Sequence, residues 1–175
     1  MIKGKSINIR NVREKDLDDF YRLSFDYEDA GAFMPISLTS ERAFKKEFTM
    51  TGFWQEQCGK LIIEDKSGKI IGEIGSFNTA HYMDGREIYY RVFSGHTGRG
   101  YASEALKLFI KFFFQSTSMN RLQAVTIIGN EVSEHMLKKS QFTYEGTLRQ
   151  ARYFKGRIVD LKIFSLIRSD WQTWV

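Results

Sequence analysis

The sequence has little cysteine and no long hydrophobic run. Cys58 is the only cysteine among 175 residues, which excludes an internal disulfide and a cysteine-based metal cluster. A single thiol favours a reducing compartment, so we expect a cytoplasmic protein rather than a disulfide-stapled secreted one. No stretch approaches the roughly 18 continuous apolar residues that cross a bilayer, and the first residues lack an apolar signal core. These absences predict a soluble, unprocessed protein that does not act in a membrane.

The chain also lacks the marks of a linker or a repeat. Pro35 is the only proline, and no Gly/Ser-rich run, low-complexity tract or fixed-period repeat divides the sequence. Hydrophobic residues make up 42% and charged residues 27%, which is a globular composition. We therefore expect one domain over residues 1–175, long enough to build a core without disulfides or a structural metal.

The charge balance is moderately basic. Lys and Arg total 26 against 21 for Asp and Glu, which gives a net charge of +5 and favours phosphates, nucleic acid or acidic substrates. Acidic residues lie between the basic ones along the chain. The surplus therefore suits a small phosphorylated ligand at least as well as a nucleic-acid groove, and we expect no nucleic acid as the main ligand.

Periodicity predicts an α+β fold with a central, mostly antiparallel mixed sheet flanked by helices. The expected strands are residues 6–12, 61–65, 70–77, 86–93 and 122–128, followed by two long strands joined at Lys155 and Gly156. The expected helices are residues 13–27, 40–48 and 132–139, and one after Gly100 whose apolar stripe runs from Ala102 to Phe113. Ser40 before Glu41 is typical of a helix N-cap.

The segment SGHTGRGYASEA carries the clearest chemical signal. Gly95, Gly98 and Gly100 stand directly ahead of the third helical stripe. Glycines let successive backbone N–H groups point into one concavity, and a helix N-terminus adds positive charge, so a phosphate or pyrophosphate fits there. A tight connection without a ligand explains the same residues equally well. The pattern is neither a P-loop nor a GxGxxG dinucleotide turn.

Several linked motifs resemble the GNAT superfamily of N-acetyltransferases, most closely its RimL-like branch. They are the meander, the turn TGRGYASEA, the strand LQAVTII, the run Asn130-Glu131-Val132-Ser133 and Phe142. The resemblance extends from INIRNVREKD to the last hairpin and Trp171. It implies an acetyl-CoA-dependent enzyme that acetylates a primary amine by direct attack in a ternary complex, without a metal.

The resemblance also implies the residues of the acetyl-CoA site. Those that would hold the pyrophosphate are Gly98, Arg99, Gly100, Tyr101 and Ala102. Val92 and Phe93 would supply backbone contacts to pantetheine, Asn130 would lie near the CoA arm, and Ser133 would begin a helix beside the thioester sulfur.

Three positions depart from the family pattern. Thr97 stands where the family usually has Gln or Arg, so one side-chain contact to phosphate is missing. Gln141 replaces the usual glycine before Phe142, so that turn is expected to adopt another backbone or to bear strain. Leu137 occupies the position of the tyrosine that many members use as general acid, which puts that mechanism in doubt more than the activity.

Acetyl transfer needs a proton acceptor and a route to reprotonate the thiolate. Glu87, on the strand that leads to the turn, is the first candidate base, and its alternative is a solvated residue paired with Arg86 or Arg91. Glu73 is the second candidate. Ser133 could orient or protonate the thiolate, or it could simply cap its helix. Glu104 fits helix-terminus electrostatics better than catalysis.

The sequence does not distinguish between two classes of acceptor, a protein N-terminus and a small amine. Phe33, Met34, Phe53 and Trp54 could form an apolar wall for it or could cover the sheet. The three histidines show no ligand spacing, so no zinc site is expected. A homodimer is plausible because related enzymes pair. The competing functions are a catalytically inactive acyl-CoA-binding or sensory module on the same fold and a nucleic-acid-binding domain with salt-dependent affinity.

Overall fold

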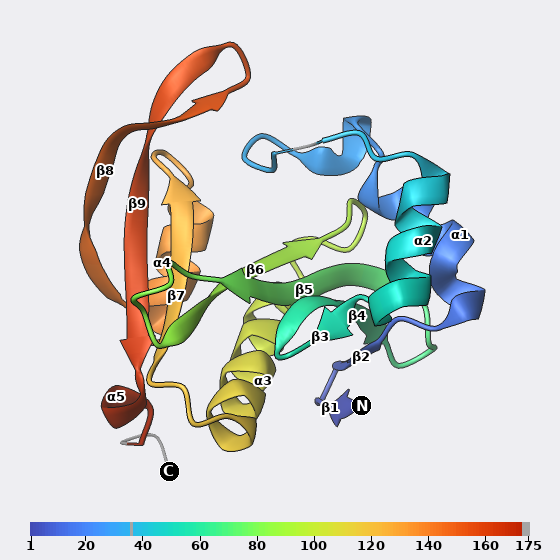
Figure 1. The fold of residues 1–175 in the computed structure, drawn as a ribbon, viewed down its shortest axis with the longest axis horizontal. Helices are drawn as coiled ribbons and strands as arrows, with labels where there is room; N and C mark the ends of the chain where they lie inside the picture. Colours follow the sequence, from blue (N-terminus) through green and yellow to red (C-terminus); the bar gives the residue numbers. More distant parts are fainter. Residues whose placement is uncertain (36, 173–175) are drawn as a thin grey trace. The chain divides into compact units, whose positions relative to one another are not determined.

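Strand β6 (Gly85–Val92) and helix α3 (Tyr101–Ser116) each contribute to two units of the structure. The computed structural model describes residues 1–35 and 37–172. The first unit contains Met1–Ser76 and Tyr89–Phe109, and the second contains Phe77–Ile88 and the chain from Ile110 onward. Figure 1 labels the elements.

The first unit is built on a meander of strands rich in β-branched residues, as expected from their strand propensity. Its antiparallel order is β2 (Ile7–Asn11), β4 (Cys58–Asp65) and β5 (Ile70–Asn78). The side chain of Asp65 accepts the backbone N–H groups of Ser67 and Lys69 and so fixes the predicted hairpin turn. The two-residue strands β1 (Ile2–Lys3) and β3 (Trp54–Gln55) were not predicted, because so short a segment has no periodicity.

Two helices cover one side of this meander. The predicted helix 13–27 is shorter in the structure: the 3-10 turn η1 (Glu14–Asp16) leads into α1 (Leu17–Ser24). It stops because the Asp26 side chain accepts the N–H groups of Glu28 and Asp29 and turns the chain into η2 (Glu28–Ala30). Helix α2 (Glu41–Thr51) begins as predicted, with the Ser40 hydroxyl accepting the Ala43 N–H at 3.2 Å.

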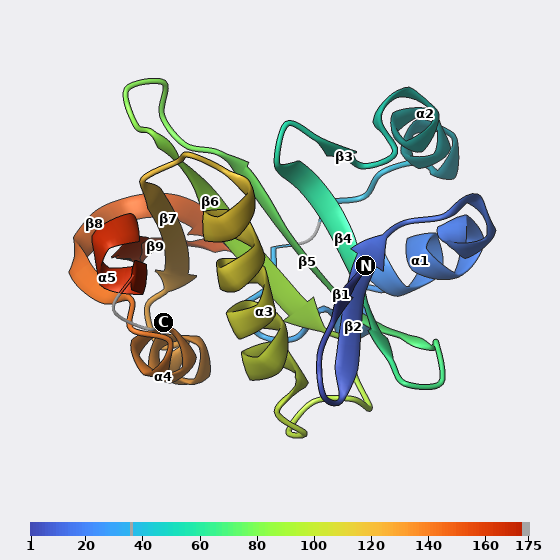
Figure 2. The same cartoon turned by 90° about the horizontal axis from the view of Figure 1, so that it is seen from below.

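Aromatic rings fill the space between these helices and the strands. Phe44 and Phe53 lie 4.6 Å apart between ring centroids, and both contact Phe20. Figure 2 shows α1 and α2 on the same side of β2 and β4, with the first half of α3 on the opposite side. Phe53 is only 2% exposed, so it covers the sheet, whereas Phe33 is 38% exposed.

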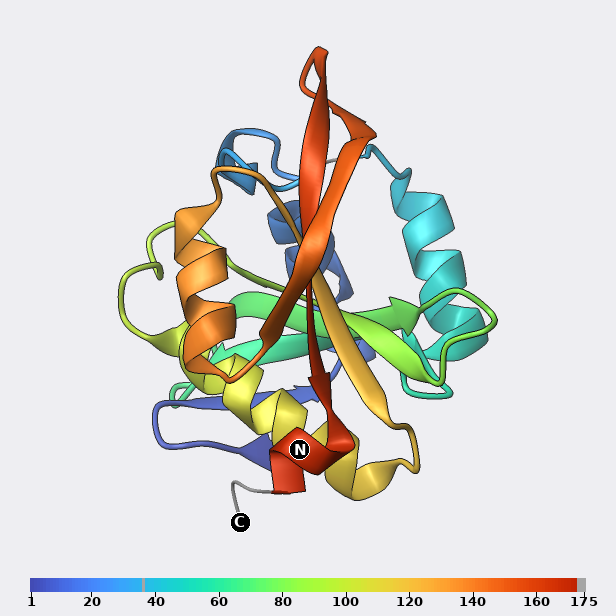
Figure 3. The same ribbon diagram turned by 90° about the vertical axis from the view of Figure 1, so that its left-hand side faces the viewer.

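In the second unit, strands of both directions form the sheet. The start of β6 pairs in parallel with β7 (Arg121–Ile127), β7 pairs antiparallel with β9 (Arg157–Ile167), and β9 pairs antiparallel with β8 (Thr143–Phe154). Figure 3 shows the strong twist of the β8–β9 hairpin beside α4 (Glu131–Lys139). The predicted α+β fold with a mostly antiparallel mixed sheet is confirmed.

The C-terminal end of the second unit is held by one cation and one aromatic stack. The Arg168 guanidinium donates hydrogen bonds to the carbonyls of Phe114, Thr117 and Met119. Trp171, in the short helix α5 (Arg168–Gln172), stacks on Phe114 at 5.3 Å. No helix in residues 1–35 or 37–172 is both long enough and apolar enough to span a bilayer.

The expected strain at Gln141 is confirmed. Its φ is 61°, in the left-handed region that favours glycine. Two hydrogen bonds at the end of α4 stabilise this strained backbone. The Gln141 N–H donates to the Lys138 carbonyl and the Phe142 N–H donates to the Leu137 carbonyl, both at 3.0 Å. The same hydrogen-bond pattern ends helices that have a glycine at this position.

Candidate functional site

The glycine-rich turn links β6 to α3 in the first unit. The φ values of Gly95, Gly98 and Gly100 are 77°, 74° and 78°, a backbone conformation that residues with a Cβ rarely adopt. A Cβ at Gly98 or Gly100 would meet no atom within 4 Å, so the turn is open beside its backbone. Helix α3 begins at Tyr101, and the Glu104 N–H donates to the Gly100 carbonyl at 3.0 Å. An open turn ahead of a sixteen-residue helix fits an anion such as a pyrophosphate.

Phe93, which follows the last residue of β6, uses part of its hydrogen-bonding capacity within the protein. The Phe93 N–H donates to the Ile71 carbonyl at 2.9 Å, and the Phe93 carbonyl accepts the His96 N–H at 3.2 Å. Gly72 lets β5 and β6 approach closely, because a Cβ there would clash with the Arg91 carbonyl. The Phe93 side chain is buried and Val92 is half-buried. A pantetheine contact at Phe93 would therefore fall on its carbonyl, which can accept a second bond.

A buried charged group lies on the α1/α2 side of the meander. Glu73 is directly opposite Ile62, and Ile62 belongs to the aromatic core beneath those helices. The Glu73 side chain is only 7% exposed, and its carboxylate has no hydrogen-bond partner among the described residues. Burial raises the pKa of Glu73, and the nearby charges of Arg91 and Lys60 oppose that rise. A raised pKa makes this carboxylate a stronger base than a solvated one, which suits it to accept a proton.

Tyr89 and Arg91 of β6 complete this buried group. The Tyr89 ring packs over Gly75, where a Cβ would come within 2.9 Å of the phenolic oxygen. Burial, followed by the charges of Glu73 and Glu47, raises the pKa of Tyr89 well above its usual value. At neutral pH Tyr89 therefore keeps its proton, and its hydroxyl can donate as well as accept a hydrogen bond.

Asp29 joins η2 to the end of β6. Its carboxylate accepts the Ser94 N–H with both oxygens, at 2.9 and 3.1 Å, and lies 3.7 Å from the Arg91 guanidinium. Arg91 also donates to the Ser24 carbonyl at 3.0 Å and stacks over the Phe93 ring. The segment after α1 is thereby fixed to the residue that opens the glycine-rich turn.

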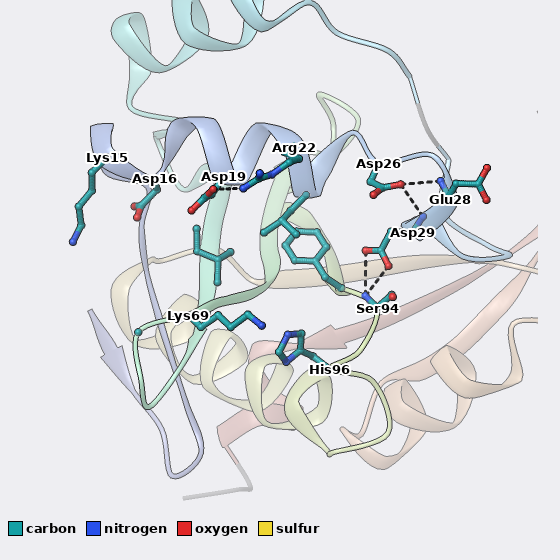
Figure 4. A pocket seen from close by; sticks show the side chains of 14 residues that line it. Lys15, Asp16, Asp19, Arg22, Asp26, Glu28, Asp29, Lys69, Ser94 and His96 are labelled. Atoms are coloured by element: carbon teal, nitrogen blue, oxygen red, sulfur yellow. Dashed lines mark hydrogen bonds and ion pairs between the residues drawn. The ribbon is translucent and has the colours of Figure 1, made fainter.

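A cavity of about 750 Å³ opens beside this contact. Figure 4 shows its wall of α1 side chains facing Lys69 and His96, with Asp29 over Ser94. Burial lowers the pKa of His96, as do the positive charges of Lys69 and Arg99, so this imidazole is neutral at physiological pH. Most carboxylates of the wall are engaged: Asp19 pairs with Arg22, and Asp16 pairs with Arg10.

Other predicted site residues belong to the second unit. Asn130 is the N-cap of α4, with its side-chain oxygen accepting the Ser133 N–H at 3.2 Å. Asn130, not Ser133, therefore caps this helix, and the capping alternative for Ser133 is wrong. Glu87 accepts a hydrogen bond from the Gln123 amide at 2.8 Å, a partner that is neither of the two arginines expected. Leu137 is fully buried.

Glu104 has the structural role expected of it, through a different contact. Its carboxylate accepts the Ser6 N–H at 2.9 Å and so ties the start of β2 to α3. Cys58 is the first residue of β4, and His135 lies exposed on α4. No group of three or more His, Cys, Asp or Glu residues in the described chain is placed to hold a metal ion.

The sequence analysis did not identify Asp29, Tyr89 or Arg91 as site residues. Arg91, like the predicted candidate Glu73, is a charged residue within a strand that is otherwise mostly apolar or aromatic, and this contrast could have marked it as a site residue. Asp29 lies in a segment without periodicity, 65 positions from Ser94, so nothing in the sequence pairs the two.

Comparison with known proteins agrees with this geometry. A family model described as an acetyltransferase (GNAT) domain matches residues 6–143. The chain is 36% identical over 111 residues to the uncharacterized N-acetyltransferase p20 of Bacillus licheniformis, covering 63% of this chain and 62% of that protein. It is 28% identical over 114 residues to the ribosomal-protein-serine acetyltransferase of Escherichia coli (strain K12), covering 65% and 63%. The second relative bears out the RimL-like resemblance.

A solved structure supports the same fold. The spermidine N-acetyltransferase from Vibrio cholerae, in complex with CoA and spermine, matches with a TM-score of 0.85 at 15% identity. The match covers 97% of this chain and 99% of that one, and at such low identity it shows the fold alone. The chain aligns with about three fifths of the length of the two sequence relatives. Because the family model spans most of its length, the chain belongs to the GNAT family of acetyltransferases.

Proposed function

We propose that this protein moves the acetyl group of acetyl-CoA to a primary amine by direct attack in a ternary complex. The observation that carries the proposal is the open turn of Gly98 and Gly100 at the start of α3, in the same unit as the buried carboxylate of Glu73. Relatives named N-acetyltransferases support it. A cytoplasmic location and a homodimer stay predictions.

The proposed acetyl-CoA site follows the backbone from β6 into α3. Backbone N–H groups of residues 98–102 would bind the pyrophosphate, with Arg99 adding an exposed positive charge. Val92 and Phe93 would contact pantetheine, and Asn130 would lie near the CoA arm. Thr97 is exposed and too short to replace a Gln or Arg contact, so the backbone supplies most of the anion binding.

We place Glu73 first as the general base. An attacking amine must be neutral, and a buried carboxylate with a raised pKa is matched to taking its proton. The charges of Arg91 and Lys60 limit the rise in the pKa of Glu73 that burial causes, and so favour its ionised form. Glu87 stays a second candidate. Ser133 would orient the departing thiolate by a hydrogen bond, or pass it a proton taken in turn from water so that the hydroxyl is restored, since the Leu137 side chain has no proton to give.

The acceptor is a protein N-terminus or a small amine. One relative is named for ribosomal proteins, and one structural neighbour is a spermidine N-acetyltransferase. A catalytically inactive acyl-CoA-binding module is the second candidate function. It is favoured by Leu137, which is fully buried at the position of the family tyrosine.

Thermal unfolding with and without acetyl-CoA tests the proposal, followed by thiol release with a panel of amines and N-terminal peptides. Selective binding to the folded state raises Tm. Gly98→Ala should remove the shift, whereas Gly52→Ala, at a similar positive φ in an open helix cap, should lower Tm and keep the shift. Absence of a shift in the native protein contradicts the cofactor site. A shift without turnover favours the binding module.

A further inference from the structure

The tip of the last hairpin concentrates the positive charge of the chain. Residues 147–159, which we call the cationic ribbon, contain Arg149, Arg152, Lys155 and Arg157 and no Asp or Glu. They contribute +4 of the net charge of +5. The basic surplus thus has a strong local cluster, contrary to the expectation of an even spread. The hairpin creates it by folding Phe154 opposite Arg157 and Arg152 opposite Val159.

The cationic ribbon extends beyond the rest of its sheet. Strand β7 pairs with β9 only from Leu161 to Ile167, and the Ile128 N–H donates to the Asp160 carbonyl at 3.2 Å, so among the described residues no backbone pairing is present on that side for residues 157–159. Figure 1 shows the hairpin projecting past the end of β7. The Gln150 N–H donates to the Asp160 side chain at 2.7 Å, where the register of β8 shifts. The projection is therefore a fixed, bulged ribbon rather than a loose loop.

The two faces of the ribbon differ. Phe154 and Val159 are buried with Ile127 on one face. Tyr153 and Ile158 stand opposite each other on the other face and are 73% and 61% exposed. Leu148 is 46% exposed. Because side chains alternate along each strand, Arg152 and Arg157 belong to the face of Phe154 and Val159, so a partner that contacts both these cations and the exposed apolar pair must reach around an edge of the ribbon.

The nearest acidic residue in the hairpin, Asp160, is bonded to the Gln150 backbone rather than to an arginine of the ribbon. Arg149, Arg152 and Arg157 are exposed and form no ion pair among the described residues. At the base of the same hairpin, Lys162 binds both oxygens of Glu134 at 2.8 Å, and Arg121 pairs with Glu145. Two cations at the base of the hairpin are thus paired with carboxylates, whereas the three arginines of the ribbon are not.

We infer that the cationic ribbon docks an acidic polypeptide segment of the protein that carries the acceptor N-terminus. The inference rests on the proposed function and narrows its acceptor class. A second copy of this chain packed ribbon to ribbon would bring like charges together. A nucleic acid would satisfy the arginines through phosphates but would leave Ile158 and Leu148 without an apolar partner. An acidic segment with apolar residues satisfies both features.

The test uses two fluorescent peptides that share four N-terminal residues and continue with six Glu or six Gln. Binding is measured by anisotropy without acetyl-CoA, and acetylation kinetics are measured with it. We expect the Glu peptide to bind about tenfold more tightly than the Gln peptide. Arg149→Glu/Arg152→Glu/Arg157→Glu should abolish this preference and raise KM for the Glu peptide. Its kcat and its Tm shift with acetyl-CoA should stay native.

A matched control carries the same charge change elsewhere. Lys46→Glu/Lys107→Glu/Lys111→Glu alters three exposed lysines of α2 and α3, and it should keep the preference for the Glu peptide. Equal binding of the two peptides, or equal loss in both triple variants, overturns the inference. So does tighter binding of a single-stranded RNA of equal charge, or a native dimer that only the ribbon variant dissociates. Glu-peptide binding without an acetyl-CoA shift would refute the proposed function and leave the docking surface standing.

Discussion

Asp29 accepts the backbone N–H of Ser94 with both carboxylate oxygens. The contact connects the segment after α1 to the residue that opens the glycine-rich turn. Because Arg91 lies 3.7 Å from the same carboxylate, removal of Asp29 would loosen the turn and leave a buried cation without its anion. Asp29 is thus a positioning residue for the proposed acetyl-CoA site.

Asp29→Ala should lower stability by about 1–3 kcal/mol, the usual loss for a charge-assisted hydrogen bond in a mostly buried place. It should also raise KM for acetyl-CoA more than it lowers kcat. Asp29→Asn keeps one acceptor oxygen and should recover part of both effects. Asp19→Ala, which removes an exposed pair with Arg22, is the control and should change little. Equal effects at the two positions would show that Asp29 has no special role.

Glu73→Gln should separate activity from stability. Burial raises the pKa of Glu73, so the folded protein holds this proton more tightly than the unfolded chain does. Stability therefore falls as pH rises from the ordinary value of 4.5 through the raised pKa. The variant should resist urea better than the native protein at pH 8 and lose that advantage below about pH 4.5.

The same substitution should remove the acid limb of the pH–rate profile, because the rate requires ionised Glu73. Glu87→Gln is the comparison and should keep that limb. Persistence of the limb in Glu73→Gln, with its loss in Glu87→Gln, would reverse the order of the two candidate bases. Urea unfolding across pH and the pH dependence of kcat/KM are the two measurements.

Asn130→Ala and Ser133→Ala should affect different properties. The first removes the cap of α4 and should cost about 1 kcal/mol in urea unfolding. The second keeps the backbone N–H that Asn130 accepts, so it should cost less stability while kcat falls. A Ser133→Ala enzyme with native kcat would remove Ser133 from the mechanism.

Gln141→Gly should stabilise the protein by up to about 1 kcal/mol, because the left-handed backbone at φ 61° strains a residue with a Cβ. The greater freedom of glycine in the unfolded chain offsets part of this gain. Gln123→Gly in β7, where no positive φ is present, should destabilise. A loss of stability in Gln141→Gly would mean that side-chain contacts of Gln141 outweigh the strain.

One cooperative unfolding transition is expected, since both units share β6 and α3. Trp54 reports on the first unit through its contact with Phe109, and Trp171 reports on the second through Phe114. Variants that keep only one of the three tryptophans should give the same urea midpoint by fluorescence as by circular dichroism. Separate midpoints within one variant would contradict the single domain expected over residues 1–175.

The local chemistry of this protein was determined by the sequence itself. Ser40 begins α2 because its hydroxyl accepts the Ala43 N–H, and glycines at positions 98 and 100 adopt a backbone that few other residues tolerate. Period-two and helical spacing placed most strands and helices within a few residues, because each depends on neighbours in the chain. The strain at Gln141 was also predicted before the structure was known, but through the family pattern, which has a glycine at that position.

Tertiary structure alone decided which distant groups meet. Asp29 reaches Ser94, and Glu73 lies buried near Arg91, only after the meander has folded beneath α1 and α2. The four cations of the ribbon are already neighbours in the sequence, and the tertiary structure decided that the hairpin carries them beyond the end of β7. Burial and charge depend on what packs around a residue, so Glu73 became a better base candidate than Glu87 only when its surroundings were known.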